Sequence, residues 1–238
     1  MMEAIILAGG LGTRLGDKTK EIPKPMLPVG GRPFLDTLLD YWRAQGIDHF
    51  VLGVGHKHEV IESHIGNDYK GSYVSYSIEK ELLGTGGGLL MAVKRLKTSH
   101  PFLVLNGDTF FEVSLKALAH FHEEKEAECS MSLFKISDAD RYEGIQMDDS
   151  YRVESVLGRD QMQTSPYANG GVYLMTFHLV DEFVIDTPKK QSLETDLFPE
   201  MLSQGKDIYG FVSGGRFLDI GTPEDYARSA DILNERKC

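Results

Sequence analysis

A glycine-rich segment near the N-terminus is followed by cations that suit a polyphosphate. Residues 7–15 read Leu-Ala-Gly-Gly-Leu-Gly-Thr-Arg-Leu, and Lys24 follows within a Pro-Lys-Pro. Glycines can turn sharply and let backbone N–H groups approach phosphate oxygens. Arg14 can clamp phosphates bidentately, and Lys24 can supply a mobile point charge. The spacing therefore predicts a polyphosphate site.

Two familiar glycine motifs do not fit this segment. A dinucleotide fingerprint needs a third glycine where Leu15 stands and a helix directly after the loop, which we do not expect here. A Walker sequence needs Gly-Lys-Ser/Thr, which is absent. A plain turn is the alternative for the glycines, but a turn does not require Arg14 and Lys24.

Two aspartates far apart in the chain are candidate ligands for Mg²⁺. Asp108 follows the apolar run 102–105, and Asp219 stands in Asp-Ile-Gly-Thr-Pro near the C-terminus. Mg²⁺ takes hard oxygen ligands and often needs only one or two from the protein. Each aspartate alone could instead form a turn or a cap. The eight histidines form no pattern of metal ligands.

The elements that must position these residues alternate through the first half of the chain. We expect strands over 4–8, 50–52, 74–78 and 102–105, and helices over 34–42, 60–65 and 89–96, the last preceded by a glycine cluster at 84–88. Such alternation predicts an α/β fold with an open, mostly parallel central sheet and helices on both faces. Ligands of such sheets bind beyond the carboxyl ends of the strands, where the glycine-rich segment falls.

The second half is expected to add antiparallel strands. Strand-like runs dominate 127–175, interrupted by a polar loop over 159–165, which predicts a mixed sheet and a cover over the site. A last helix is expected to start at Thr222-Pro223, with Thr222 as its N-cap.

Length, charge and cysteine content exclude several classes of protein. The 238 residues suit one domain, and the net charge of −11 argues against binding nucleic acid or an anionic membrane surface. No apolar run approaches the roughly 20 residues of a membrane span, and no signal peptide is apparent. Two cysteines give no disulfide framework, which favours the cytoplasm. The oligomeric state, monomer or homodimer, stays open.

Six segments, in order, resemble sugar-1-phosphate nucleotidyltransferases. They are the glycine-rich segment with its Pro-Lys-Pro, Leu83-Gly84-Thr85-Gly86-Gly87, Asn106-Gly107-Asp108, Asn169-Gly170-Gly171-Val172-Tyr173, Ser192-Leu193-Glu194 and Asp219-Ile220-Gly221-Thr222-Pro223. Within that family, residues 79–81, 106–111 and 192–198 look most like D-glycero-D-manno-heptose 1-phosphate guanylyltransferases. The resemblance implies a three-layer Rossmann-like nucleotidyltransferase fold, with 1–110 mainly binding the nucleotide and 111–238 mainly binding the sugar.

The resemblance also implies a reaction. A nucleoside monophosphate, best matched by that of GTP, would pass to a sugar 1-phosphate, best matched by D-glycero-D-manno-heptose 1-phosphate, with Mg²⁺ as cofactor and pyrophosphate as the second product. A hexose or N-acetylmuramic acid 1-phosphate with UTP or dTTP is the alternative pair. A non-catalytic nucleotide or sugar-phosphate sensor, or a regulatory subunit, is the alternative of another class.

The resemblance also implies roles for individual residues of this chain. We expect Arg14, Lys24 and Asp108 to be catalytic, and Asp108 and Asp219 to hold the metal. The expected nucleotide contacts are Leu7, Ala8, Gly9, Gly10, Gly12, Thr13, Arg14, Glu79, Gly84, Thr85 and Gly86. The expected sugar-phosphate contacts are Lys24, Asn106, Gly107, Arg159, Asn169, Gly170, Gly171 and Glu194.

Two of these positions allow a second interpretation, and a third departs from the pattern of the family. The 84–88 glycines could admit a flat base, with Glu79 reading its edge, or could form a flexible loop that opens a helix. Glu194 could contact the sugar or sit in the first turn of a helix, where a carboxylate is favoured anyway. Where the family commonly shows a Glu-Lys pair, this chain has Gly158-Arg159, so only the cationic role toward the sugar phosphate is expected to remain.

Overall fold

The computed structural model describes residues 1–136, 144–157, 165–184 and 189–234. The strands are β1 (Met2–Leu7), β2 (Pro28–Val29), β3 (Arg32–Pro33), β4 (Ile47–Val54), β5 (Asp68–Tyr69), β6 (Ser72–Ile78), β7 (Phe102–Asn106), β8 (Thr109–Phe111), β9 (Cys129–Lys135), β10 (Gly144–Met147), β11 (Val153–Leu157), β12 (Tyr167–Met175), β13 (Ile208–Val212) and β14 (Phe217–Asp219). The α-helices are α1 (Phe34–Ala44), α2 (His58–Ile65), α3 (Gly84–Ala92), α4 (Leu115–Glu124), α5 (Phe177–Asp181), α6 (Phe198–Ser203) and α7 (Pro223–Asn234). Shorter turns are the 3-10 segments η1 (Thr13–Thr19), η2 (Lys24–Met26) and η3 (Val93–Arg95) and the π-helical turn η5 (Leu193–Leu197).

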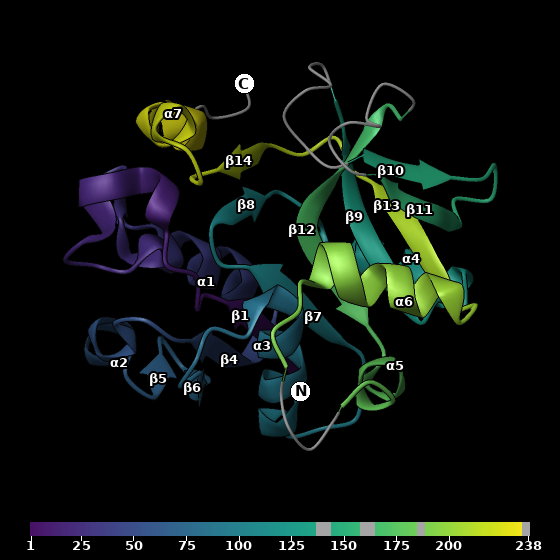
Figure 1. Cartoon of the computed structure of the whole chain (residues 1–238), viewed down its shortest axis with the longest axis horizontal. Coiled ribbons are helices and arrows are strands. Elements are labelled where there is room, and N and C mark those ends of the chain that lie inside the picture. The colour runs from purple at the N-terminus through teal and green to yellow at the C-terminus, as the bar shows by residue number, and fades with distance from the viewer. Residues whose placement is uncertain (137–143, 158–164, 185–188, 235–238) are drawn as a thin grey trace.

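A mixed sheet of ten strands forms the centre of the molecule (Figure 1). Its main path runs β11-β10-β12-β7-β1-β4-β6-β5, and β9 joins β12 to β13. Strands β7, β1, β4 and β6 are parallel, while β12 is antiparallel to both β7 and β9. The predicted α/β fold is therefore confirmed, with mostly parallel strands from the first half, while the second half adds antiparallel pairs and the parallel pair of β9 and β13.

Helices cover both faces of the sheet because side chains of each strand alternate between two cores. In β1, Ala4 and Ile6 belong to the core with the apolar side chains of α1, α2 and α4, and Ile5 belongs to the core with those of α3, α5 and α6. All three side chains are fully buried. The three-layer arrangement follows directly, with β1 central as predicted.

Two predicted helices are confirmed together with their ends. Phe34, Leu38 and Trp42 lie on one buried face of α1, and the chain leaves the helix at Gly46, whose φ is +97°. At the other end of the chain, the Asp225 N–H donates to Thr222 Oγ1 at 3.2 Å, so Thr222 caps α7.

Strand β14 is tied to the rest of the fold by aromatic side chains. The ring of Phe217 stacks on that of Phe134 in β9, with centroids 4.1 Å apart, and meets Phe111 edge-on in β8. This aromatic packing fixes β14, whose last residue is Asp219.

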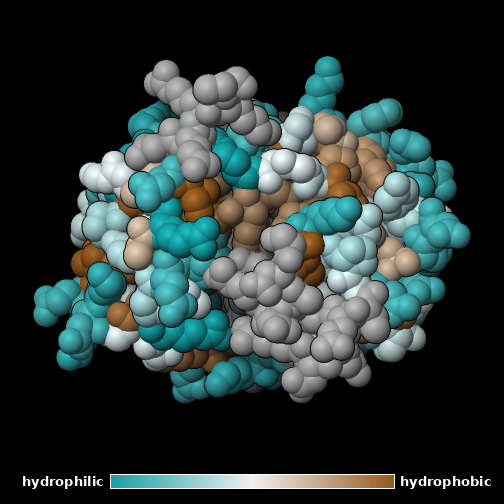
Figure 2. Space-filling model, turned by 90° about the horizontal axis from the view of Figure 1, so that it is seen from above, coloured by the Kyte–Doolittle hydropathy of each residue, from teal (hydrophilic) through white to brown (hydrophobic). Residues whose placement is uncertain are grey.

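Seen from above, hydrophobic residues gather near the centre of this face of the molecule and hydrophilic residues around its margin (Figure 2).

Two local predictions were wrong. The glycines at 84–88 are not a loop before a helix, because α3 starts at Gly84. The segment 169–171, which we expected to precede a strand over 172–175, lies within β12, where the pairing with β9 is irregular. As predicted, no α-helix directly follows the loop after Gly12, which continues into the 3-10 turns of η1.

Other expectations concern the polar loop and membrane spans. The polar loop 159–165 lies outside the described residues except for Ser165. Within the described part of the chain, no helix is both long and apolar enough to cross a bilayer.

Candidate active site

Two adjoining cavities lie at the carboxyl ends of the central parallel strands. The larger, of about 370 Å³, is lined by Leu7, Ala8, Gly10, Arg14, Lys24, Pro25, Thr85, Asn106, Gly107, Asp108, Thr109, Asn169, Gly171, Glu194, Phe217 and Asp219. The smaller, of about 290 Å³, is lined by Leu7, Gly9, Gly10, Leu11, Gly12, Thr13, Glu79, Leu82, Gly84, Thr85 and Lys190. Leu7, Gly10 and Thr85 line both, so one ligand can occupy the two cavities together.

The glycine-rich segment forms the wall between the cavities. Gly12 adopts φ +64°, and a Cβ there would lie 2.8 Å from Cγ2 of Thr19, so glycine is required. The Thr19 hydroxyl contacts the carbonyl oxygens of Gly12 at 3.1 Å and Gly16 at 3.2 Å, which closes the loop on itself. Arg14, on the exposed side of this loop, lines the larger cavity.

Lys24, Asp108 and Asp219 meet in the larger cavity although they are far apart in sequence. Lys24 Nζ lies 2.6 Å from Asp108 Oδ2. Strand β14 pairs with β8 and places Asp219 opposite Thr109, directly beside the turn that carries Asp108. A Cβ at Gly221 would lie 2.7 Å from Asp219 Oδ1 and 3.1 Å from Lys24 Nζ, so the two side chains flank the same point.

The electrostatics of this cluster favour a divalent cation. Burial and the neighbouring charge of Asp108 raise the pKa of Asp219, although Lys24 and the N–H of Gly221 lower it in part. Among the described residues, no cluster of three or more His, Cys, Asp or Glu side chains could hold a metal. One or two carboxylates are what Mg²⁺ takes from a protein when phosphates and water complete its shell, so Asp108 and Asp219 fit the predicted ion.

The smaller cavity combines apolar walls with one carboxylate. Leu7, Leu11 and Leu82 supply the apolar surface, and Glu79 reaches in from the end of β6. Burial raises the pKa of Glu79, and the Leu83 N–H, which donates to Oε2 at 2.9 Å, offsets part of that effect. A flat heterocycle with N–H donors at one edge fits such a slot.

The glycines of α3 pack against the chain that precedes η5. A Cβ at Gly84 would lie 2.5 Å from the carbonyl oxygen of Gln191, and one at Gly87 would lie 2.5 Å from that of Lys189. Gly84 lines the smaller cavity, whereas Gly86 lines neither cavity. The close approach of two backbones gives this glycine cluster a packing role, which was not predicted from the sequence.

Most of the expected sugar-phosphate contacts line the larger cavity. Asn106, Gly107, Asn169, Gly171 and Glu194 do so. Glu194 lies in the first turn of η5, as one interpretation expected, and it also lines this cavity, so its contact with the sugar stays a prediction.

Two expected sugar-phosphate contacts remain, Gly170 and Arg159. Gly170 packs against Phe111, where a Cβ would lie 2.3 Å from the ring, and it lines neither cavity. Arg159 lies outside the described residues.

Several lining residues were missed by the sequence analysis. Thr109 and Phe217 line the larger cavity, and Leu82 and Lys190 line the smaller one. Thr109 stands three residues after Asn106 in a segment already singled out, so its neighbourhood was a usable signal. Lys190 and Phe217 approach the cavities only through tertiary contacts.

Comparisons with known proteins found a matching family model, similar sequences and similar solved structures. A family model described as nucleotidyl transferase matches residues 3–236. The chain is 37% identical over 232 residues to D-glycero-alpha-D-manno-heptose 1-phosphate guanylyltransferase of Aneurinibacillus thermoaerophilus, covering 98% of each chain. It is 38% identical to a protein of the same name from Campylobacter jejuni, covering 94% of this chain and 97% of the relative. The crystal structure of HddC from Yersinia pseudotuberculosis complexed with GMP-PN superposes with a TM-score of 0.84 at 32% identity, covering 98% of this chain and 100% of that one.

Proposed function

We propose, on the premise that this chain belongs to the nucleotidyl transferase family, that it transfers GMP from GTP to D-glycero-α-D-manno-heptose 1-phosphate. The products are GDP-heptose and pyrophosphate. The observation that carries the proposal is the pair of adjoining cavities, one apolar with Glu79 and the other polar with Lys24, Asp108 and Asp219. The names of the two relatives and the GMP-PN complex of HddC support the choice of sugar and base.

The reaction is an in-line displacement at the α-phosphorus of GTP. An oxygen of the sugar 1-phosphate forms the new P–O bond, and the bond from the α-phosphorus to the bridging oxygen of pyrophosphate breaks. The attacking phosphate is already ionised near pH 7, so no general base is needed. The protein therefore acts by positioning the two substrates and neutralising their charge.

Two cations carry the neutralisation. We assign Lys24, which is 11% exposed beside Asp108, to the negative charge between the two substrates. Arg14, exposed on the loop after β1, suits the leaving pyrophosphate because its fork binds two phosphate oxygens. Asp108 and Asp219 would hold Mg²⁺, which would supply further positive charge beside the phosphates.

Base selection is assigned to the smaller cavity. Guanine presents two neighbouring N–H donors, at N1 and N2, and the Glu79 carboxylate is an acceptor at the wall of the apolar slot. A uracil or thymine edge offers a single N–H donor between two carbonyl oxygens, which a carboxylate would repel. This difference supports GTP over UTP and dTTP.

The two parts of the chain divide the work. All residues that line the smaller cavity except Lys190 come from 1–110, whereas Asn169, Gly171 and Glu194 of the larger cavity come from 111–238. This distribution supports a nucleotide-binding first half and a sugar-binding second half within one domain. We place the reaction in the cytoplasm, where GTP is supplied and where Cys129, a buried free thiol, stays reduced.

The test is pyrophosphate release with Mg²⁺ over a grid of substrates. GTP, UTP, dTTP, CTP and ATP are each paired with heptose, mannose, glucose and N-acetylmuramic acid 1-phosphates. Release with GTP and the heptose phosphate is expected. Release with another pair would keep the mechanism and replace the substrates, and binding without release from any pair would indicate the non-catalytic sensor instead.

A further inference from the structure

Glu194 is held in the larger cavity by four side-chain donors. Thr85 Oγ1 and Ser192 Oγ donate to Oε2 at 2.8 Å and 3.0 Å. Tyr173 OH and Asn106 Nδ2 approach Oε1, each at 3.5 Å. The first oxygen is bound tightly and the second loosely, so a ligand hydroxyl can bind at Oε1 while the carboxylate keeps its anchor at Oε2.

The direction of the Tyr173 hydrogen bond is set by a backbone amide. The Gly171 N–H donates to Asn169 Oδ1 at 3.0 Å, so Nδ2 of Asn169 must face Tyr173, to which it donates at 2.7 Å. The Tyr173 oxygen therefore accepts from Asn169, and its own proton is directed at Glu194. One hydroxyl thus orients two of the expected sugar contacts.

Thr85 connects the start of α3 to the segment that carries Glu194. Its hydroxyl donates to Glu194 and accepts from the Leu193 N–H at 2.8 Å. Beside it, the Gly86 N–H donates to the carbonyl oxygen of Gln191 at 3.0 Å. Thr85 therefore sits on the nucleotide side of the chain but acts on a carboxylate of the sugar side.

We propose that Thr85 and Tyr173 are positioning residues that hold the Glu194 carboxylate for a hydroxyl of the sugar 1-phosphate. The proposal rests on the function proposed above and deepens it. The Tyr173 ring is fully buried and packs against Phe198, with centroids 5.1 Å apart, so its hydroxyl is a fixed donor. Neither hydroxyl needs to touch the sugar.

Single-hydroxyl deletions test the proposal. Thr85→Val and Tyr173→Phe each remove one oxygen and little volume, and each is expected to raise KM for the sugar 1-phosphate roughly tenfold, because a hydrogen bond to a charged group is lost. Tyr173→Phe should leave KM for GTP within about twofold of the wild type. Thr85→Val, at a residue that also lines the smaller cavity, should raise KM for the sugar 1-phosphate clearly more than KM for GTP. Thr85→Ser keeps the hydroxyl and should restore the sugar KM. Thr195→Val, which changes an exposed hydroxyl one residue after Glu194, is the matched control and should change neither constant.

A double-mutant cycle separates positioning from general damage. In a Glu194→Gln background, adding Thr85→Val or Tyr173→Phe should change the sugar KM by less than about twofold, since the group they position is already altered. Full, independent effects in that background would overturn the proposal. An equal rise in KM for GTP with Thr85→Val would do the same, because it would make Thr85 a nucleotide contact only.

Wild-type protein measured first keeps this proposal distinct from the proposed function. If the wild type turns over the substrates and the variants keep its sugar KM, the function stands and the positioning proposal fails. If the wild type releases no pyrophosphate from any pair, the function fails, and calorimetric titration with the sugar 1-phosphates then decides. Weaker binding by the two variants would support positioning, whereas equal binding, or no binding by the wild type, would overturn it.

Discussion

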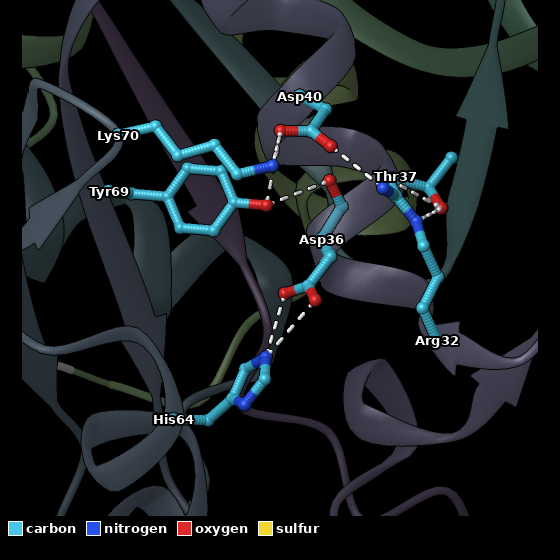
Figure 3. A network of polar contacts seen from close by, with 7 residues as sticks. All are labelled: Arg32, Asp36, Thr37, Asp40, His64, Tyr69 and Lys70. Carbon is cyan, nitrogen blue, oxygen red and sulfur yellow. Dashed lines mark hydrogen bonds and ion pairs between the residues drawn. The ribbon is translucent and has the colours of Figure 1, made fainter.

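On the outer side of α1, Asp40 has a cation on each oxygen, whereas in the larger cavity two aspartates share one lysine. Arg32 contacts one Asp40 oxygen at 2.8 Å and Lys70 the other at 2.6 Å, and His64 contacts the neighbouring Asp36 at 2.9 Å (Figure 3). Burial tends to raise the pKa of Asp40, but the hydrogen bonds from Lys70 and Arg32 outweigh it and lower that pKa. The folded state thus favours this charge.

In the cluster of Lys24, Asp108 and Asp219 in the larger cavity, burial and like charge outweigh the attraction of the lysine for Asp219. Burial and the charge of Asp108 raise the pKa of Asp219, so folding disfavours its charged form even though Lys24 is close. Residues of the protein itself satisfy the α1 network, whereas the cavity cluster gains from an added cation. The contrast predicts that the first cluster serves stability and the second serves binding.

The largest effect is expected where the cavity loses its cation. Lys24→Ala should leave a folded protein whose turnover falls by about 10²–10³, because removing one charge-stabilising contact typically costs that factor. The turnover of Asp108→Asn should fall by at least about the same factor. Pyrophosphate release measures both. Unchanged turnover in either variant would remove that residue from the mechanism.

Asp219→Asn should separate function from stability. Turnover should fall by about 10² or more, while the free energy of unfolding without metal should rise at pH 7. The sign follows from the raised pKa of Asp219, because folding disfavours its charged form. The ionised carboxylate therefore destabilises the folded state fully above the folded pKa, and it costs nothing below the ordinary pKa of 3.8, where the group is protonated in both states. Mg²⁺ should raise the Tm of the wild type and not of this variant. A destabilised variant at pH 7 would contradict the comparison.

The buried pair of Glu3 and His49 is a second polar cluster that we expect to serve stability. Glu3 Oε1 lies 2.6 Å from His49 Nδ1, and the N–H groups of Lys97 and Thr98 donate to the same carboxylate at 2.8 Å and 2.9 Å. Glu3→Gln should lower the free energy of unfolding by about 3 kcal/mol, since the amide nitrogen of glutamine cannot accept the buried hydrogen bonds that one carboxylate oxygen now accepts. Urea denaturation at pH 7 measures the loss.

The pH dependence of the same variant checks the cause. Burial would raise the pKa of Glu3, but the hydrogen bonds from Thr98, Lys97 and His49 lower it below its usual 4.5. Its stabilisation is therefore present above pH 4.5 and lost as the pH falls through the folded pKa. The variant should lack this acid-dependent component, and identical pH profiles for wild type and variant would refute the assignment.

The smallest effect is expected in the α1 network. Asp40→Asn should cost about 1 kcal/mol of stability, because its partners Arg32 and Lys70 are half exposed and solvent screens them. Turnover should stay within about twofold of the wild type. Thermal unfolding and pyrophosphate release on one preparation give both numbers. A large loss of turnover would mean that this network also serves the site.

Much of the candidate site was predictable because its residues follow strands. The glycine-rich loop follows β1 and Asp108 follows β7, and the carboxyl ends of parallel neighbours meet at one edge of the sheet. Gly86 and Gly170 were expected there and instead pack against other backbone and ring atoms. Lys190 could not be predicted, because its approach depends on how the chain before η5 crosses α3.

The sequence by itself determined the elements whose signals are local. The buried run of β1, the apolar face of α1 and the Thr222 cap of α7 depend on neighbours within a few residues, so their patterns suffice.

Only the tertiary structure decided that Gly84 begins a helix. Glycine disfavours helix formation, but here contact with the backbone at Gln191 and hydrogen bonds to it outweigh that preference. The tertiary structure likewise brings Asp219 to Lys24, because strand pairing and the packing of Phe217 join segments whose separation in sequence carries no local signal.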